Sequence, residues 1–198
     1  MTTLVFATNN VHKLEELRAV AGDRFEIKSL SDIGCHDDIP EDADTLEGNA
    51  LAKARWVNER YGVDCIADDT GLEVDALGGR PGVHSARFAP GSDHDSAANM
   101  RHLLTLMHGV PAGHRTARFR TVIALMISGR EPELFQGRVE GRILDAPAGE
   151  GGFGYDPLFV PDGWDKSFGQ ATAEEKNSVS HRARACRALI EGLCRLTD

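Results

Sequence analysis

The chain has 198 residues, of which 41% are hydrophobic, and its formal net charge is -9 at pH 7. This length and apolar content suffice for a buried core, in one domain or in two closely joined lobes. The negative charge argues against a nucleic-acid polymer as a partner, because binding to a phosphate backbone needs clustered Lys and Arg. The negative net charge is still compatible with a small anionic ligand that a few local cations and a metal ion would hold.

Two further classes of protein are disfavoured. The sequence has no run of about eighteen apolar residues, and its start, MTTLVFATNN, has neither a basic segment nor a small-residue cleavage site. We therefore expect a cytoplasmic protein with no membrane partner. The cysteines form no CxxC pair, which predicts buried reduced thiols rather than zinc ligands or disulfides; they are Cys35, Cys65, Cys186 and Cys194.

The first third of the chain predicts alternating strands and helices. TLVFAT predicts a strand, a tight turn follows, and residues 11–22 predict a helix. FEIKSL predicts a second strand, and the acidic segment SDIGCHDDIPEDAD predicts a loop. A second helix is predicted over residues 45–61, with Thr45 as its N-cap and with Asn49 and Lys53 one turn apart.

The rest of the chain predicts a sheet that extends beyond these elements. CIADDTGLEV predicts a third strand before a glycine-rich loop, and residues 93–108 predict a helix. ARFRTVIALMIS and ELFQGRVEGRIL predict paired antiparallel strands, and Thr172 with Glu175 has the spacing of a helix capping box. We expect an α/β fold with a mixed β-sheet flanked by helices, in two lobes with a central substrate groove.

The turn TNNVHK, residues 8–13, joins the first predicted strand to the first helix. A helix N-terminus presents unpaired N–H groups and the positive end of the helix dipole, which together attract anions. Lys13 could reach the same anion. The segment matches neither GxxxxGK[ST] nor GxGxxG, so Asn9 and Asn10 can equally be simple capping residues.

Asp68 and Asp69 stand side by side where the third strand is predicted to end. Neighbouring side chains of a regular strand point to opposite faces, so both avoid the core only if the chain leaves the sheet there. Ligands of α/β proteins bind at that edge, and carboxylates suit Mg²⁺, which takes one or two of them together with water and phosphate oxygens. Glu41 could add a third carboxylate; the alternative is a solvated acidic turn.

GGFGYDP, residues 151–157, combines glycines with aromatic side chains. The glycines allow close backbone approach, whereas Phe153 and Tyr155 offer flat apolar surfaces and Asp156 follows directly. A planar base stacked on Phe153 would suit this segment. A hairpin turn packed by its own aromatic residues would need no ligand.

EEKNSVSHR, residues 174–182, surrounds a predicted helix N-cap with polar groups. Lys176 precedes this cap, and His181 and Arg182 follow it. The last two side chains can donate hydrogen bonds to a carbonyl group on a base edge. The alternative is an ordinary polar start of a helix.

Five motifs in this order resemble one family. TNNVHKLEEL, TLEGNALAKA, ADDTGLEVDALGGRPGVHSAR, GGFGYDPLF and EEKNSVSHRARA resemble the noncanonical purine nucleoside triphosphate pyrophosphatases, also called inosine triphosphatases or XTP/dITP diphosphatases. The resemblance extends over about residues 3–193. The chain has TNN where TGN is common in the family, and Thr70 where many members carry serine.

The resemblance implies a role for each matching residue. Asp69 would be the general base and a metal-binding carboxylate, with Asp68 and Glu41 beside it near Mg²⁺. His181 and Arg182 would read the purine 6-keto group. The positions that match substrate-binding residues are Thr8, Asn9, Asn10, Val11, His12, Lys13, Lys53, Thr70, Phe153, Gly154, Tyr155, Asp156, Lys176, His181 and Arg182.

The resemblance also implies an activity: hydrolysis of ITP, dITP and XTP to the monophosphate and pyrophosphate by a homodimer whose single domain spans residues 1–198. Two alternatives are a nucleotide-binding regulatory protein with little turnover and a pyrophosphatase for modified pyrimidine triphosphates. The joint retention of Lys13, Lys53, Asp68 and Asp69 speaks against the first. The purine-reading SHR and GGFGYD segments speak against the second.

Overall fold

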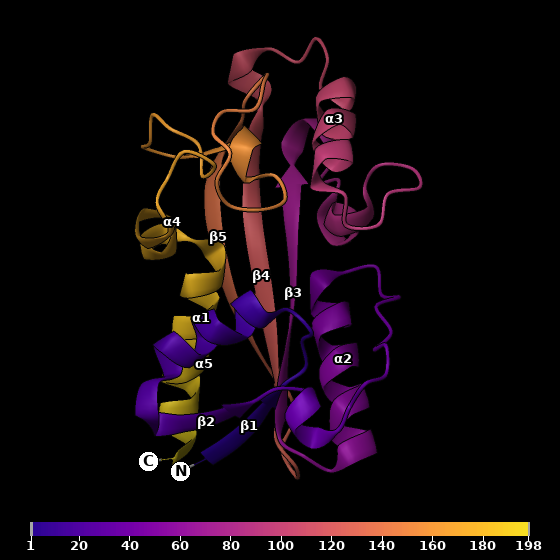
Figure 1. The fold of residues 1–198 in the computed structure, drawn as a ribbon, viewed down its shortest axis with the longest axis vertical. Coiled ribbons are helices and arrows are strands. Elements are labelled where there is room, and N and C mark those ends of the chain that lie inside the picture. Colours follow the sequence, from indigo (N-terminus) through magenta and orange to yellow (C-terminus); the bar gives the residue numbers. More distant parts are fainter. Residues whose placement is uncertain (1, 198) are drawn as a thin grey trace. The chain divides into compact units, whose positions relative to one another are not determined.

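A six-stranded sheet runs through the computed structural model, which describes residues 2–197 (Figure 1). Its strand order is β2-β1-β3-β4-β5-β6. The strands are β1 (Thr2–Phe6), β2 (Phe25–Lys28), β3 (Cys65–Val74), β4 (Thr116–Met126), β5 (Glu133–Ile143) and β6 (Phe159–Pro161). Strand β1 pairs in parallel with β2 and β3, whereas β5 and β6 are antiparallel. The prediction of an α/β fold with a mixed sheet is confirmed.

Helices α2 and α4 begin at the caps predicted from the sequence, whereas the helix expected over residues 93–108 is shorter and begins after Asp95. The α-helices of the described chain are α1 (Val11–Ala21), α2 (Leu46–Tyr61), α3 (Ser96–Leu106), α4 (Ala173–Val179) and α5 (His181–Thr197). The Thr45 hydroxyl accepts a hydrogen bond from Gly48 N at 3.0 Å, and Thr172 and Glu175 form the predicted capping box. Both caps satisfy backbone N–H groups that the first helical turn leaves without a partner.

The chain divides into two compact units. Unit 1 comprises Met1–Asp69, Thr121–Gly137 and Arg182–Asp198, and unit 2 comprises Thr70–Arg120 and Arg138–His181. Strands β3, β4 and β5 each contribute residues to both units. The two units agree with the two lobes expected from the sequence, and the single domain expected over residues 1–198 stays a prediction.

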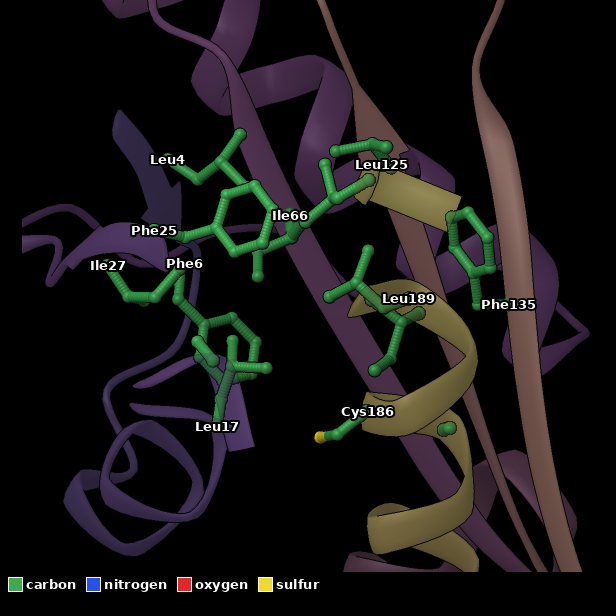
Figure 2. Packing of buried hydrophobic residues seen from close by; sticks show 14 of the residues in the cluster. Leu4, Phe6, Leu17, Phe25, Ile27, Ile66, Leu125, Phe135, Cys186 and Leu189 are labelled. Carbon is green, nitrogen blue, oxygen red and sulfur yellow. The ribbon is translucent and has the colours of Figure 1, made fainter. Parts of the chain in front are cut away.

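The core of unit 1 lies on the face of β3 that α1 and α5 cover. Ile66 of β3 packs in one apolar cluster with Leu17 of α1 and Leu189 of α5 (Figure 2). On the opposite face, the Cys65 thiol donates to the carbonyl oxygen of Ala54 in α2 at 3.0 Å. Figure 1 shows α5 and α2 on opposite sides of β3. Successive residues of β3 therefore meet different helices, as the alternation of a strand requires.

The core of unit 2 is rich in aromatic rings. The Phe119 ring centroid lies 4.7 Å from that of Phe159 and 6.3 Å from that of Phe168. The buried Arg115 guanidinium donates hydrogen bonds to four backbone carbonyl oxygens, which are those of Met107, Val110, Ile143 and Leu144. These bonds satisfy the donors of a cation buried in unit 2.

In the part of the chain that the structure describes, the cysteines form no disulfide, and three of them, Cys35, Cys65 and Cys186, are buried in unit 1. Burial raises the pKa of both Cys65 and Cys186 to about 12. These two thiols are therefore protonated at neutral pH and pack as small apolar groups. Within residues 2–197, none of the helices combines the length and the apolar character that crossing a membrane demands.

Candidate active site

Asp68 and Asp69 lie inside β3 and not at its end. The strand continues from Cys65 to Val74, so the expectation that the chain leaves the sheet at these carboxylates is wrong. The physical reason is that both faces of β3 supply polar partners at this point. Asp68 shares the face of Ile66, toward α1 and α5, and Asp69 shares the face of Cys65, toward α2.

The Asp68 carboxylate is buried among cations. Its side chain is 3% exposed, and Oδ2 lies 2.7 Å from Lys13 Nζ without the alignment of a hydrogen bond. Burial on its own raises the pKa of Asp68, but the positive charges of Lys13, Lys53 and Arg182 outweigh this effect and lower the pKa below its ordinary value. Asp68 is therefore a buried, ionised carboxylate at neutral pH.

The Asp69 carboxylate is held by α2. Its Oδ2 accepts a hydrogen bond from Asn49 Nδ2 at 2.9 Å, and Asn49 Oδ1 accepts one from Ala43 N at 2.9 Å. The buried Asn49 amide thus links Asp69 to the acidic loop before α2. The sequence shows Asn49 one turn before Lys53 but gave no reason to assign it to the site, because a polar helix residue is usually solvated.

Lys53 lies within electrostatic reach of three carboxylates. Its Nζ donates to Glu41 Oε1 at 2.5 Å, and its side chain is 8% exposed. Burial on its own lowers the pKa of Lys53, but the charges of Asp68, Asp69 and Glu41 outweigh this effect and raise it. The predicted metal carboxylates and Lys53, a predicted substrate-binding residue, therefore form a single charged cluster in unit 1.

This cluster offers hard oxygen donors of the kind that Mg²⁺ prefers. Within residues 2–197, no three His, Cys, Asp or Glu side chains are placed so that they could hold a metal ion by themselves. An ion that takes one or two carboxylates and completes its shell with phosphate and water oxygens fits this donor set. The assignment of Asp69, Glu41 and Asp68 to a metal stays a prediction.

The first turn is built around the N-cap of α1. Asn10 Oδ1 accepts hydrogen bonds from the backbone N of His12 at 3.0 Å and of Lys13 at 3.3 Å, and Thr8 Oγ1 accepts one from Asn10 N at 3.1 Å. The capping interpretation of Asn10 is confirmed. Val11 is 62% exposed, and Asn9 and His12 are exposed as well. Their assignment to substrate binding stays a prediction.

Arg182 joins α5 to α1. Its Nη1 donates to Glu16 Oε2 at 2.7 Å, and the arginine side chain is 6% exposed. Glu16 was not among the predicted residues. Its position three residues after Lys13 on the same helix is the signal that could have found it, because residues at that spacing share a helix face.

A second constellation lies in unit 2 around the GGFGYDP segment. Asp156, which is 1% exposed, accepts hydrogen bonds at Oδ2 from Phe153 N at 2.8 Å and from Lys176 Nζ at 2.6 Å. The Lys176 ammonium lies 4.3 Å from the Phe153 ring centroid, within the range of a cation–π contact. Gly152 has a positive φ of 72°, and a Cβ there would lie 2.1 Å from Asp156 Oδ2. The turn therefore requires glycine at this position.

Tyr155 and His181 belong to the packed part of unit 2. The Tyr155 hydroxyl donates to the carbonyl oxygen of Ser85 at 2.7 Å, and burial raises the pKa of Tyr155. The His181 ring stacks on Phe119 with centroids 4.9 Å apart and an interplanar angle of 17°. Phe153, in contrast, is 52% exposed, so of these aromatic rings it is the one open to a ligand.

The structure thus gathers the predicted residues into two groups. Unit 1 holds Thr8, Asn9, Asn10, Val11, His12, Lys13, Glu41, Lys53, Asp68, Asp69 and Arg182, and unit 2 holds Thr70, Phe153, Gly154, Tyr155, Asp156, Lys176 and His181. Each group has direct contacts among its own members. The first is rich in charge, and the second combines an exposed ring with one buried ion pair.

A family model described as the Ham1 family matches residues 4–192. The chain belongs to the Ham1 family. It is 53% identical to a dITP/XTP pyrophosphatase of Porphyromonas gingivalis over 98% of both chains, and 43% identical to one of Bacillus subtilis over 96% of both.

Solved structures of the Ham1 family have the same fold. The Staphylococcus aureus Ham1 protein matches with a TM-score of 0.90 and 35% identity, and covers 97% of this chain and 98% of its own. A nucleoside-triphosphatase, or dITP/XTP pyrophosphatase, of Mycobacterium abscessus matches with a TM-score of 0.82 and 42% identity over 95% and 98%. The family and the fold inferred from the sequence motifs are confirmed.

Proposed function

We propose that this Ham1 family chain hydrolyses noncanonical purine nucleoside triphosphates, namely dITP, XTP and ITP, to the monophosphate and pyrophosphate. The observation that carries the proposal is the identity of 43–53% to dITP/XTP pyrophosphatases over nearly the full chain. The charged cluster of unit 1 supplies groups suited to phosphate chemistry. This activity would remove such nucleotides from the nucleotide pool, and no observation favours a purely regulatory role.

The proposed reaction joins a water oxygen to the α-phosphorus and breaks its bond to the oxygen that bridges to the β-phosphorus. Asp69 would accept the water proton at a carboxylate oxygen, while the Asn49 amide fixes the position of that carboxylate. Lys13 and Lys53 would neutralise charge that develops on the phosphate oxygens. Pyrophosphate leaves in this scheme, and no covalent intermediate on the protein is needed.

The proposed metal is Mg²⁺, held by Asp69 and Glu41 with Asp68 close by. When bound, it supplies Lewis-acid neutralisation of the phosphates and lowers the pKa of coordinated water. A divalent cation is supported by the donor set. The carboxylates of Asp69, Glu41 and Asp68 lie close enough together for all three to raise the pKa of Lys53, and carboxylate oxygens are the ligands that Mg²⁺ prefers.

The proposed base contact is the exposed ring of Phe153, with Lys176 and Asp156 keeping that ring and its turn in place. His181 and Arg182 would donate to the purine 6-keto oxygen. Opposite a 6-amino group the same donors would lack an acceptor, at a cost of about 1–3 kcal/mol for each buried donor. Such mismatches disfavour ATP, whereas GTP, which also has a 6-keto group, must be rejected through another contact.

We also propose a cytoplasmic homodimer, on the strength of the resemblance to the family. Size-exclusion chromatography with light scattering on the purified chain tests the assembly. A mass of twice 21.5 kDa is expected, and a mass of 21.5 kDa contradicts it.

The experiment that tests the function is a product assay with Mg²⁺ and six separate substrates: ITP, XTP, dITP, ATP, GTP and dUTP. Pyrophosphate and orthophosphate are measured separately, so that the assay reports which bond breaks. We expect pyrophosphate and monophosphate from the first three substrates and little turnover of the others. Orthophosphate release, or tight ITP binding with no product, would contradict the proposal.

A further inference from the structure

Asp68 and Asp69 are adjacent in sequence but have different partners. Asp69 accepts from Asn49 of α2, and Glu41 accepts from Lys53 of the same helix. Asp68 lies on the opposite face of β3, where its close contact is Lys13 of α1. Asp69 and Glu41 are thus the two carboxylates bonded to side chains of α2. Asp68 is oriented away from that pair by the alternation of the strand.

The charges around Asp68 also disfavour a metal. Lys13, Lys53 and Arg182 all lie close enough to lower its pKa. A divalent cation that approached Oδ2 would have to displace the Lys13 ammonium from 2.7 Å and would be repelled by the other two cations. Glu41 also contacts an ammonium, that of Lys53, but the Glu41 side chain is 41% exposed, whereas Asp68 is enclosed and is therefore the poorer ligand for a metal ion.

The same surroundings suit a different task. A lysine side chain is a flexible four-carbon stem with three N–H donors, so an unrestrained ammonium samples many positions. Asp68 holds one side of the Lys13 ammonium, and the backbone of Lys13 is fixed by the Asn10 cap at the start of α1. Because the Lys13 side chain is restrained at both its backbone and its ammonium, its remaining N–H donors can point at a phosphate at little further cost in conformational entropy.

We propose that Asp68 is a positioning residue, which fixes Lys13 for the triphosphate, and that it does not bind the metal. This inference rests on the proposed function, because Lys13 has phosphate to bind only if the substrate is a nucleotide. It leaves Asp69 and Glu41 as the metal carboxylates. Asp68 then acts on the reaction chiefly through Lys13, its close contact.

The test is a double-mutant cycle of Asp68→Asn and Lys13→Met, with Asp69→Asn as the matched carboxylate control. The kinetic readouts are kcat and KM for ITP at several Mg²⁺ concentrations. In the natural background we expect Asp68→Asn to lower kcat about thirtyfold or more while the Mg²⁺ concentration at half-maximal rate stays within about twofold. With Lys13→Met already present, the same change should alter kcat less than about threefold.

The second readout is urea unfolding in EDTA, which needs no activity. If Asp68 anchors Lys13, Asp68→Asn lowers the unfolding midpoint, and adding Lys13→Met restores part of it, because the buried ammonium is then no longer left without a counter-charge. The control Asp69→Asn keeps an oxygen that can accept from Asn49, so its unfolding midpoint in EDTA should change little, with or without Lys13→Met. Should Asp68→Asn alone not fold, a folded double variant supports the proposal, and failure of both overturns it.

Two results overturn the proposal while the function stands: a tenfold or larger rise in the Mg²⁺ requirement of Asp68→Asn, or equal losses of kcat with and without Lys13. The failure of the proposed function looks different. In that case the natural chain itself does not release pyrophosphate from ITP, while the unfolding cycle in EDTA still reports whether Asp68 anchors Lys13.

Discussion

Each unit of the molecule contains one buried aspartate paired with a lysine, and the two pairs differ in what surrounds them. In unit 1, Asp68 lies 2.7 Å from Lys13, with further cations near it. In unit 2, Asp156 lies 2.6 Å from Lys176 and also accepts from a backbone N–H, that of Phe153. The first carboxylate is held mainly by charge, and the second by hydrogen bonds of a turn.

The difference shows how one pair of residue types serves two purposes. Backbone hydrogen bonding ties Asp156 to a fixed loop shape, so its pair with Lys176 organises the Phe153 ring. Charge alone ties Asp68 to movable side chains, so phosphate groups can share its lysine without unfolding a turn. We therefore expect changes in unit 1 to affect chiefly the rate, and changes in unit 2 to affect chiefly affinity and stability.

The largest effect is expected at Asp69, which is adjacent in sequence to Asp68 of the unit 1 pair. Asp69→Asn removes the proposed general base and keeps the size of the side chain, so kcat for ITP should fall by about 10²- to 10⁴-fold. The unfolding midpoint should change little. Asp42→Asn, the same change at an exposed position of the acidic loop, is the control and should stay within about twofold. An unchanged kcat in Asp69→Asn would remove this residue from the mechanism.

The second pair can be broken by Asp156→Asn. Breaking a buried ion pair costs about 3–5 kcal/mol, and because the Lys176 side chain is 13% exposed we expect the free energy of unfolding to fall by about 3 kcal/mol. Because the Phe153 turn loosens, KM for ITP should rise, whereas kcat at saturation should change less than about fivefold. Urea unfolding and steady-state kinetics measure both quantities, with the exposed Asp162→Asn as control. A fall in kcat at unchanged KM would contradict the contrast between the two units.

Much of the fold could be predicted from local patterns. Helical periodicity places α1 and α2 within one or two residues, and the capping box of Thr172 and Glu175 places the start of α4. The length of β3 could not be predicted in this way. Adjacent aspartates indicate the end of a strand only if no polar side chain packs against either face of the sheet. Here α1 and α2, which are distant in sequence from β3, supply such side chains.

In the candidate site, too, the sequence predicts the residues but not their tertiary partners. The motifs name residues such as Lys13 and Asp156, but they do not give their partners. Asn49 and Glu16 escaped prediction because a polar residue on a helix is ordinarily solvated, and only the packed helices show that these two meet Asp69 and Arg182. Partner identity is a property of tertiary contacts.

A smaller effect is expected from the ring that the second pair organises. Phe153→Ala removes the exposed stacking surface, and stacking of a base on an aromatic side chain contributes about 1–3 kcal/mol, so KM for ITP should rise by about 5- to 150-fold. Stability should change by less than about 0.5 kcal/mol, because the ring is 52% exposed. Leu134→Ala, at a 39% exposed apolar residue, is the control. An unaltered KM would show that the base does not stack on Phe153.

The smallest effect concerns the thiols, which belong to unit 1 alone. Folding raises the pKa of Cys65 and Cys186 to about 12, whereas an unfolded thiol has a pKa of about 8.5. The unfolded chain therefore releases these protons first, so the stabilisation is fully present below about pH 8.5 and is lost as the pH rises toward 12. Between pH 8 and 9.5 the loss should be about 1 kcal/mol for each thiol.

Urea unfolding across this pH range measures the effect. In Cys65→Ala and Cys186→Ala the free energy of unfolding should fall less steeply with pH than in the natural chain. Only the slope is compared, because removing a buried sulfur also changes packing at every pH. Equal slopes in the natural chain and both variants would mean that these two thiols ionise as readily in the folded chain as in the unfolded one, and hence that the core of unit 1 admits water.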